Sequence, residues 1–275
     1  MEVKITDVKD LRDKTGAGMM DCKRALQESN GDMEEAIVWL RKKGLAAAAK
    51  KAGRVAAEGL SAVIVKGNKG AAIELNSETD FVSKNAQFQS LVREIASKAL
   101  EVTNIEELKA SSVGSGKTVE DLITENIATI GENLNLRRME TVEVSNGVIS
   151  TYIHNAVVDG MGRIAVLVAL ESDGDKAKLD MLGKQIAMHI AAARPIALKQ
   201  SDVGSSLVER EKEIFAEQAR NSGKPENIIE KMIEGRIRKY YEEVVLLEQI
   251  FVIDGKSKVS DVVAGFAKEL GMPVE

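Results

Sequence analysis

The chain has 275 residues, of which 44% are hydrophobic and 3% aromatic, and 38 basic against 43 acidic residues give a net charge of −5. This length suits one large domain or two or three modest ones, with enough apolar residues to bury a core. The slightly acidic balance argues against a protein that mainly binds phosphate backbones, so we expect a protein partner and no direct nucleic-acid contact.

Three helices are expected at the start of the chain. Apolar residues recur at helical spacing in three stretches, residues 6–14, 19–28 and 33–43. Asp32 can cap the third helix, Glu35 can complete a capping box, and Gly44 is expected to end the helix. We therefore predict a three-helix module over residues 1–45, followed by an alanine-rich helical linker over residues 46–58.

The next segment predicts the first half of an α+β core, residues 59–146. Two strands, residues 60–66 and 71–75, precede the stretch Asn76-Ser77-Glu78-Thr79-Asp80-Phe81-Val82, and an amphipathic helix starts near Asn85. One or two further helices over residues 104–130 and a strand over residues 134–144 complete this half.

The loop that carries Asp80 and Phe81 is the first candidate site. Surface loops of this kind carry function more often than packing, and the chain holds only five Phe. An aromatic side chain in this loop has two interpretations: it contacts a partner, or it folds back to cap the sheet.

The second half of the core repeats the order of the first. A strand over residues 148–153, a turn at 159–162, a strand over 163–170 and a helix over 179–193 follow one another. The loop that corresponds to the first candidate site reads Ser172-Asp173-Gly174-Asp175 and has no aromatic residue, so the scaffold does not require Phe81. Two related halves indicate one antiparallel sheet-plus-helix core.

Two long charged helices follow, near residues 206–219 and 226–249, separated by Asn221-Ser222-Gly223-Lys224-Pro225. They predict an antiparallel helical hairpin, residues 201–249, that projects from the core. A short strand over residues 250–253 and a helix over residues 259–270 close the chain, so the second half of the core comprises residues 147–200 and 250–275.

Two glycine-rich stretches resemble nucleotide-binding motifs without meeting their requirements. Gly114-Ser115-Gly116-Lys117-Thr118 looks like the end of a phosphate-binding loop, but Ser111 stands where the pattern needs Gly and no strand precedes it. Gly160-Met161-Gly162-Arg163-Ile164-Ala165 joins two strands instead of opening a helix, so we interpret it as a turn.

The sequence offers no credible catalytic or metal-binding constellation. Cys22 is the only cysteine, and His154 and His189 are the only histidines. His189 lies in an apolar helical stretch and is expected to be packed and hydrogen-bonded, whereas His154 is expected to end a strand and could make a contact. Glu78 and Asp80 alternate in an extended loop, where an acid pair seldom converges.

Two further groups of residues have alternative interpretations. Lys50, Lys51 and Arg54 suit a solvated helical face or a binding surface. Met19 and Met20 are adjacent in a helix, so one is expected to pack inward while the other suits a protein interface.

Several motifs resemble bacterial elongation factor Ts and occur in that family's order. They are Thr15-Gly16-Ala17-Gly18-Met19-Met20-Asp21-Cys22-Lys23, Lys50-Lys51-Ala52-Gly53, Thr79-Asp80-Phe81-Val82, Ile130-Gly131-Glu132-Asn133 and Ala187-Met188-His189. The resemblance spans nearly the whole chain, and a series of this length is far more specific than any single motif.

The resemblance implies a guanine-nucleotide exchange factor for the GTPase elongation factor Tu, acting in translation elongation in the cytoplasm. It also implies an N-terminal module similar to ubiquitin-associated domains and a coiled-coil hairpin. GDP, GTP and magnesium would be bound by the GTPase, so this chain would need no cofactor and would catalyse no covalent reaction. The hairpin leaves homodimerisation possible, and family members usually continue past the position of Glu275 with another strand.

The resemblance also implies which residues bind the partner. Thr79, Asp80, Phe81 and Val82 would enter the GTPase near its magnesium and phosphate site. Two further groups would contact other parts of the partner, namely Arg12, Met19, Met20 and Lys23 of the N-terminal module, and Lys51, Ile130 and His154 of the linker and core.

Two other classes of function remain as alternatives: an adaptor that uses its N-terminal module to bind ubiquitin-like folds, and a nucleotide-dependent enzyme that uses residues 114–118. No apolar run approaches the roughly 18 residues that span a bilayer, and residues 1–4 hold no hydrophobic signal core, so no membrane association is expected.

Overall fold

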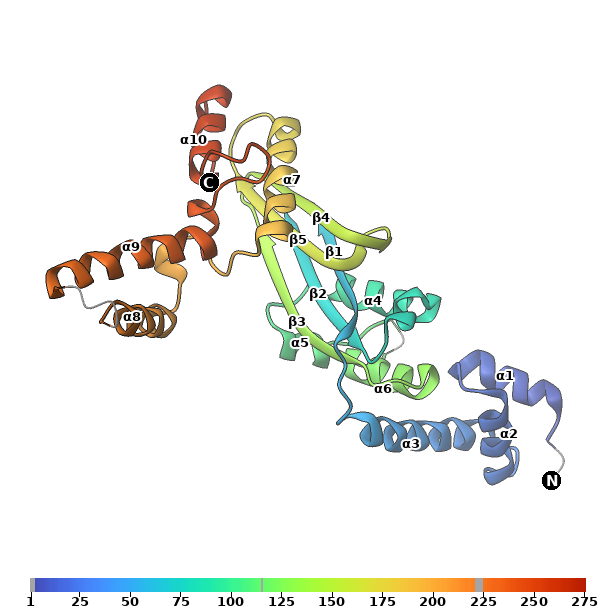
Figure 1. Ribbon diagram of the computed structural model, residues 1–275. Helices are drawn as coiled ribbons and strands as arrows, with labels where there is room; N and C mark the ends of the chain where they lie inside the picture. Colours follow the sequence, from blue (N-terminus) through green and yellow to red (C-terminus); the bar gives the residue numbers. More distant parts are fainter. Residues whose placement is uncertain (1–2, 115, 221–224) are drawn as a thin grey trace. The chain divides into compact units, whose positions relative to one another are not determined.

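The structure is a computed structural model that describes residues 3–114, 116–220 and 225–275. The chain forms two compact units, one of Met1–Thr141 with Asn155–Ala165 and one of Val142–His154 with Val166–Glu275. Strands β4 and β5, which lie side by side (Figure 1), each contribute residues to both units. Ser115 and the hairpin connector at 221–224, for which the sequence predicted a loop and a turn, lie outside the described residues. Among the described residues, no helix combines the length and apolarity needed to cross a membrane.

The first three helices pack around a small core of their own. They are α1 (Ile5–Thr15), α2 (Met19–Glu28) and α3 (Met33–Lys51). The buried residues are Val8, Leu11, Cys22, Ala25, Leu26 and Ala36, and Trp39 packs against them while half-buried. The Lys43 ammonium lies 5.4 Å from the centre of the Trp39 ring. The predicted cap is present, since the Glu35 N–H donates to Asp32 Oδ1 at 2.8 Å.

The prediction that Gly44 ends the third helix is wrong. Helix α3 continues to Lys51, and Gly44 is buried inside it. A Cβ on Gly44 would lie 3.4 Å from the Cβ of Ala128 in α6 (Val119–Ile130), so the missing side chain lets the two helices approach closely. The alanine-rich residues that follow have high helix propensity, which offsets the cost of one interior glycine.

The five strands form one sheet in the order β3-β2-β1-β5-β4. They are β1 (Glu58–Lys66), β2 (Lys69–Ser77), β3 (Asn135–Glu143), β4 (Gly147–Val158) and β5 (Met161–Glu171). The antiparallel register of β1 and β2 sets Leu60 opposite Leu75 and Ala62 opposite Ile73, which places apolar side chains on one face. The stretch that begins at Gly160 joins two strands, as predicted, but the turn is shorter than predicted: it is confined to Asp159 and Gly160, and Met161 already begins β5.

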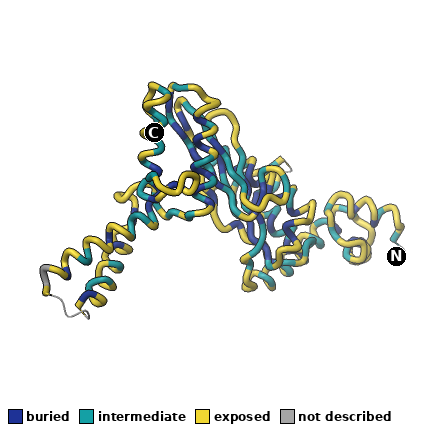
Figure 2. Tube along the Cα trace, turned by 45° about the horizontal axis from the view of Figure 1, so that its top comes forward, coloured by how far each residue is buried: buried dark blue, intermediate teal, exposed yellow. Residues whose placement is uncertain are grey.

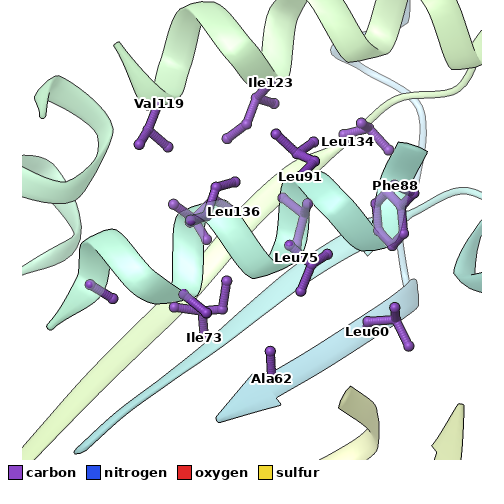
Figure 3. Packing of buried hydrophobic residues seen from close by; sticks show 14 of the residues in the cluster. Leu60, Ala62, Ile73, Leu75, Phe88, Leu91, Val119, Ile123, Leu134 and Leu136 are labelled. Atoms are coloured by element: carbon purple, nitrogen blue, oxygen red, sulfur yellow. The ribbon is translucent and has the colours of Figure 1, made fainter. Parts of the chain in front are cut away.

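The main core of the first unit lies between the sheet and its helices (Figure 3). The helices are α4 (Ala86–Ala99), α5 (Ile105–Ala110) and α6. The last two lie within residues 104–130, where one or two helices were predicted. Phe88 and Leu91 of α4 point toward Leu75 of β2, and Ile123 of α6 closes the core beside Leu134. The buried segments therefore line the sheet and the inner helix faces, while the outer faces are exposed (Figure 2).

The second unit contains α7 (Lys176–Ala193), α8 (Ser205–Arg220), α9 (Glu226–Val244) and α10 (Val259–Leu270), with short 3-10 turns at η2 (Gln200–Asp202) and η3 (Leu246–Glu248). Helices α8 and α9 pack through Val208, Phe215, Ile233 and Ile237, as expected of a helical hairpin. The predicted extension of the second hairpin helix to Gln249 is wrong. The chain leaves the helix after Val244 because Val245 forms a β-bridge with Ala197.

The predicted strand over residues 250–253 is also wrong. Only Ile250 forms a bridge, to Lys258, and a turn follows it. The fully buried His189 explains this geometry: its Nδ1 accepts from the Val252 N–H at 3.2 Å, and its ring lies 5.7 Å from that of Phe251. The Nε2 of His189 lies 2.9 Å from Gln249 Oε1. His189 is therefore a packed and hydrogen-bonded residue, as predicted.

Candidate functional site

The loop between β2 and α4 presents two adjacent side chains to solvent. It forms a short 3-10 helix, η1 (Asp80–Lys84), in which Asp80 is exposed and Phe81 is 75% exposed. The alternative in which Phe81 folds back to cap the sheet is therefore wrong. An exposed Phe beside an exposed carboxylate is a feature suited to a protein partner.

Val82, the next residue along, is placed differently from its neighbours. It is buried in the main core with Phe88, although the resemblance counts it among the partner-binding residues. In the free protein Val82 therefore anchors the loop, and the exposed residues of this stretch are Thr79, Asp80 and Phe81.

Short hydrogen bonds within the loop fix its backbone. The Ser77 hydroxyl donates to the Thr79 carbonyl at 2.9 Å, and the Ser83 hydroxyl donates to the Asp80 carbonyl at 2.6 Å. The Asn85 side chain then caps α4 by accepting from two backbone N–H groups, the one from Gln87 at 2.8 Å. The exposed pair is thus carried by a turn whose ends are both tied down.

A second segment, residues 131–133, holds the loop from outside. Glu132 accepts from both the backbone N–H and the hydroxyl of Thr79, at 2.9 and 2.6 Å. In return the Asn133 N–H donates to the Glu78 carboxylate at 2.6 Å. Sequence reasoning assigned no role to Glu132 or Asn133, which lie more than fifty positions from these partners. The motif that contains them was the available signal.

Ile130 and Lys51 lie on the two elements that meet near this segment. Ile130 is the half-buried last residue of α6, which ends at Gly131 in a left-handed conformation with φ 91°. The Lys51 ammonium donates to the Ile127 carbonyl at 3.4 Å, one turn earlier. Lys50 is exposed, as a solvated face requires, whereas Arg54 pairs with Glu78 at 3.4 Å.

The N-terminal helices expose the second predicted group. Arg12 and Lys23 are exposed, and so are both methionines, Met19 at 38% and Met20 at 75%. The prediction that one methionine packs inward is wrong, because smaller residues fill the inner face of α2, among them Cys22. Burial raises the pKa of the Cys22 thiol, an effect that outweighs its hydrogen bond with Thr15.

His154 belongs to the second unit and is exposed within β4. The expectation that it ends a strand is wrong, since β4 continues to Val158. The strand is irregular at this point, because the next residue, Asn155, has φ 52°. The Tyr152 hydroxyl lies 3.3 Å from His154 Nδ1, so the two side chains form one polar and aromatic surface.

In the stretch that resembles a phosphate-binding loop, Lys117 and Thr118 bond to side chains of the helix that follows. Thr118 caps α6: its hydroxyl oxygen accepts from the Asp121 N–H at 3.1 Å, and the Thr118 N–H donates to the Asp121 carboxylate at 3.2 Å. Lys117 pairs with Glu125 at 2.7 Å. Within the described part of the chain, no group of three or more His, Cys, Asp or Glu side chains could hold a metal ion.

Known proteins resemble this chain over its full length. A family model described as "Elongation factor TS" matches residues 78–272. Elongation factor Ts of Rhodospirillum centenum is 56% identical over 276 residues, which cover 100% of this chain and 90% of that protein. Elongation factor Ts of Rickettsia bellii is 56% identical over 276 residues, covering 100% and 89%. That of Parvibaculum lavamentivorans is 55% identical over 275 residues, covering 99% and 89%.

Proposed function

Because the chain belongs to the elongation factor Ts family, we propose that it is a guanine-nucleotide exchange factor that binds the GTPase elongation factor Tu and promotes GDP release during translation elongation. The observation that carries the finer proposal is the exposed pair Asp80 and Phe81 on a turn held at both ends. This pair inserts near the magnesium and phosphate site of the partner.

The exchange mechanism needs no covalent chemistry and works by linkage. A factor that binds the nucleotide-free GTPase more tightly than the GDP-bound form must weaken GDP binding by the same ratio. The direction of exchange then depends on the concentrations of GDP and GTP, and both nucleotides and the magnesium ion are held by the partner.

The two side chains of the loop have different roles in this proposal. Phe81 enters an apolar slot that opens as the elements around the partner's magnesium shift, and Asp80 competes for donors around the cation or repels phosphate. Burying one phenyl ring contributes about 1.5 to 3 kcal/mol, which corresponds to about ten- to a hundredfold in the equilibrium. Any larger acceleration must come from contacts elsewhere on the chain.

Three other surfaces supply those contacts. The exposed residues of the N-terminal helices, Arg12, Met19, Met20 and Lys23, dock on the nucleotide-binding domain of the partner, and Lys51 and Ile130 extend the contact beside the loop. His154 contacts a different domain of the partner. Homodimerisation stays a prediction that the helical hairpin α8 and α9 leaves open.

The test is the release of a fluorescent GDP analogue from elongation factor Tu in the presence of excess GDP. The unmodified protein should accelerate release strongly, and Phe81→Ala should lower the maximal rate at least about tenfold while the complex still forms. Val55→Ala is the matched control, because it removes an apolar side chain that is 81% exposed outside the loop. An unchanged rate for Phe81→Ala would contradict the insertion.

The same experiment separates the alternatives. An adaptor that acts through the N-terminal module would keep its partner after the Asp80 and Phe81 changes and would not accelerate release. A nucleotide-dependent enzyme would retain GTP or ATP by itself in equilibrium dialysis, whereas an exchange factor retains neither.

A further inference from the structure

The segment that holds the exposed loop has a role of its own in exchange. We infer that Glu132 is a positioning residue that acts through Thr79, holding the Asp80–Phe81 turn in its partner-binding conformation before the partner arrives. This inference rests on the proposed exchange function and deepens it.

The first observation is the unusual use of the Thr79 hydroxyl. Thr79 is the N-cap residue of η1, with extended backbone angles of φ −123° and ψ 158°, yet its side chain makes no cap hydrogen bond to that helix. A Thr at this position ordinarily accepts from an N–H of the first turn. Here the hydroxyl donates to Glu132 Oε1 at 2.6 Å while the Thr79 N–H donates to Oε2 at 2.9 Å.

The second observation is that the bonding is reciprocal. Glu132 accepts from the Thr79 N–H, and Glu78 accepts from the Asn133 N–H at 2.6 Å. The Asn133 side chain is buried and donates to the Arg54 carbonyl at 2.8 Å. Each segment thus offers a carboxylate to a backbone N–H of the other, and charge-assisted hydrogen bonds are stronger than neutral ones.

The third observation is the rigidity of the support. Glu132 follows α6, which is anchored in the main core by Ile123 and Ile127. Gly131 ends the helix in a left-handed conformation, with φ 91°, that an L side chain rarely adopts. The carboxylate is therefore presented from a fixed helix end, and its acceptor atoms meet the residue immediately before Asp80. A loop that is ordered in advance binds without the cost of ordering it.

The test measures the maximal rate of GDP release and the half-saturating concentration of the factor separately. Glu132→Ala should lower the maximal rate about tenfold and change half-saturation less than about twofold, because the exposed N-terminal helices still make the first contact. Thr79→Val should lower the rate about threefold, and Thr79→Ser, which keeps the hydroxyl, should restore it.

A double variant distinguishes a shared role from two separate effects. If Glu132 acts through Thr79, Glu132→Ala/Thr79→Val should be no slower than Glu132→Ala alone. Glu125→Ala, on the same helix, breaks the ion pair with Lys117 and is the matched control, with an expected rate equal to that of the unmodified protein. An additive double variant, or an unchanged rate for Glu132→Ala, would overturn the inference.

Hydrogen exchange of the protein without its partner tests the contact between Glu132 and Thr79 on its own. The Thr79 amide should exchange its hydrogen more slowly in the unmodified protein than in Glu132→Ala, and equal exchange rates would overturn the inference. If the unmodified protein failed to accelerate GDP release from elongation factor Tu while its Thr79 amide stayed protected, the proposed function would fail and the positioning of Thr79 by Glu132 would remain. Should Glu132→Ala fail to fold, the comparison of Thr79→Val with Thr79→Ser still decides.

Discussion

Asp254 shows at the scale of one residue how hydrogen bonds in a turn can lower the pKa of a carboxyl group. It lies in the turn after Phe251, and its Oδ1 accepts from the backbone N–H groups of Lys256 and Ser257, each at 3.0 Å. The Ser257 side chain, followed by these backbone groups, lowers the pKa of Asp254 from 3.8 to about 2. The charged carboxylate is thus part of the turn that leads into α10.

The stabilisation by Asp254 should depend on pH with a defined sign. Because the folded-state pKa is lowered, the stabilisation is complete above the ordinary value of 3.8 and disappears as pH falls through about 2. Asp254→Ala should therefore lower the free energy of urea unfolding at about pH 6, and its difference from the unmodified protein should shrink toward about pH 2.

The control for this titration is Glu269→Ala, which removes an exposed carboxylate from α10. Only the pH dependence that Asp254→Ala shows beyond this control is assigned to the turn. A difference for Asp254→Ala that stays constant over the acid range would contradict the assigned pKa.

Residue-scale features divide into those that the sequence indicates and those that it does not. The chain holds few Phe residues, and Phe81 stands in a predicted surface loop, where an aromatic residue is uncommon. An exposed contact residue is therefore one of its two interpretations. Glu132 stands in a recognisable motif, but nothing in the sequence indicates which residue it contacts. Its partner Thr79 lies 53 positions away, and only the folded chain brings the two together.

At the scale of elements, Gly183 determines how α7 lies against β4. A Cβ at this position would lie 2.3 Å from the Oγ of Ser150, and that hydroxyl is fixed because it donates to Asp180 Oδ1 at 2.8 Å. Gly183 is buried, so the helix has no free space on this side. The glycine is therefore a packing requirement of the helix–strand contact.

Gly183→Ala should destabilise the protein despite the higher helix propensity of alanine. Overpacking costs about 1 to 3 kcal/mol and the propensity gain offsets about 1 kcal/mol, so the net loss in free energy of unfolding should be about 1 kcal/mol. Gly265→Ala in α10 is the matched control, because its Cβ would meet no atom within 4 Å and it should stabilise the helix. Thermal unfolding of both variants measures this contrast, and equal effects would contradict it.

Helices and strands that a local residue pattern defines agree with the structure. The errors occur where tertiary contacts determine where an element ends. The helix over residues 259–270 matches α10, and α2 matches residues 19–28. The sequence predicts a helix end at Gly44 because glycine usually ends helices, but packing against Ala128 uses the small size of this residue inside α3. The apolar run at 250–253 looked like a strand, although its residues surround a buried histidine.

At the scale of the whole molecule, the charges of the N-terminal helices have a separate role from the loop. The chain carries a net charge of −5, so the exposed Arg12 and Lys23 are basic groups on an acidic protein. Under the proposed function they steer the approach to the partner, and long-range attraction between exposed charges is screened by salt.

Arg12→Ala/Lys23→Ala should therefore slow association with elongation factor Tu more at low salt than at high salt, by about tenfold at most. The maximal rate of GDP release at saturating factor should fall less than it does for Phe81→Ala, because the loop is intact. Stopped-flow association at several salt concentrations measures this effect. Lys9→Ala/Lys14→Ala, which removes two other exposed charges from α1, is the control for net charge alone.

The α+β class and the repeated strand-turn-strand-helix order follow from the sequence, because each half repeats the same local pattern. The way in which the halves join does not. The pairing of Ser61 in β1 with Gly162 in β5 makes one sheet of both, and it connects residues about a hundred positions apart. The predicted domain boundaries and the partner-binding roles of individual residues stay predictions.

The half-buried Trp39 gives the molecule an optical property. It is the only tryptophan in the chain, and it lies against the small core of α1, α2 and α3. Tryptophan fluorescence of the free protein therefore reports on these three helices alone. With the Lys43 ammonium beside the ring, emission from this one side chain should follow docking or melting of the N-terminal helices without any attached dye.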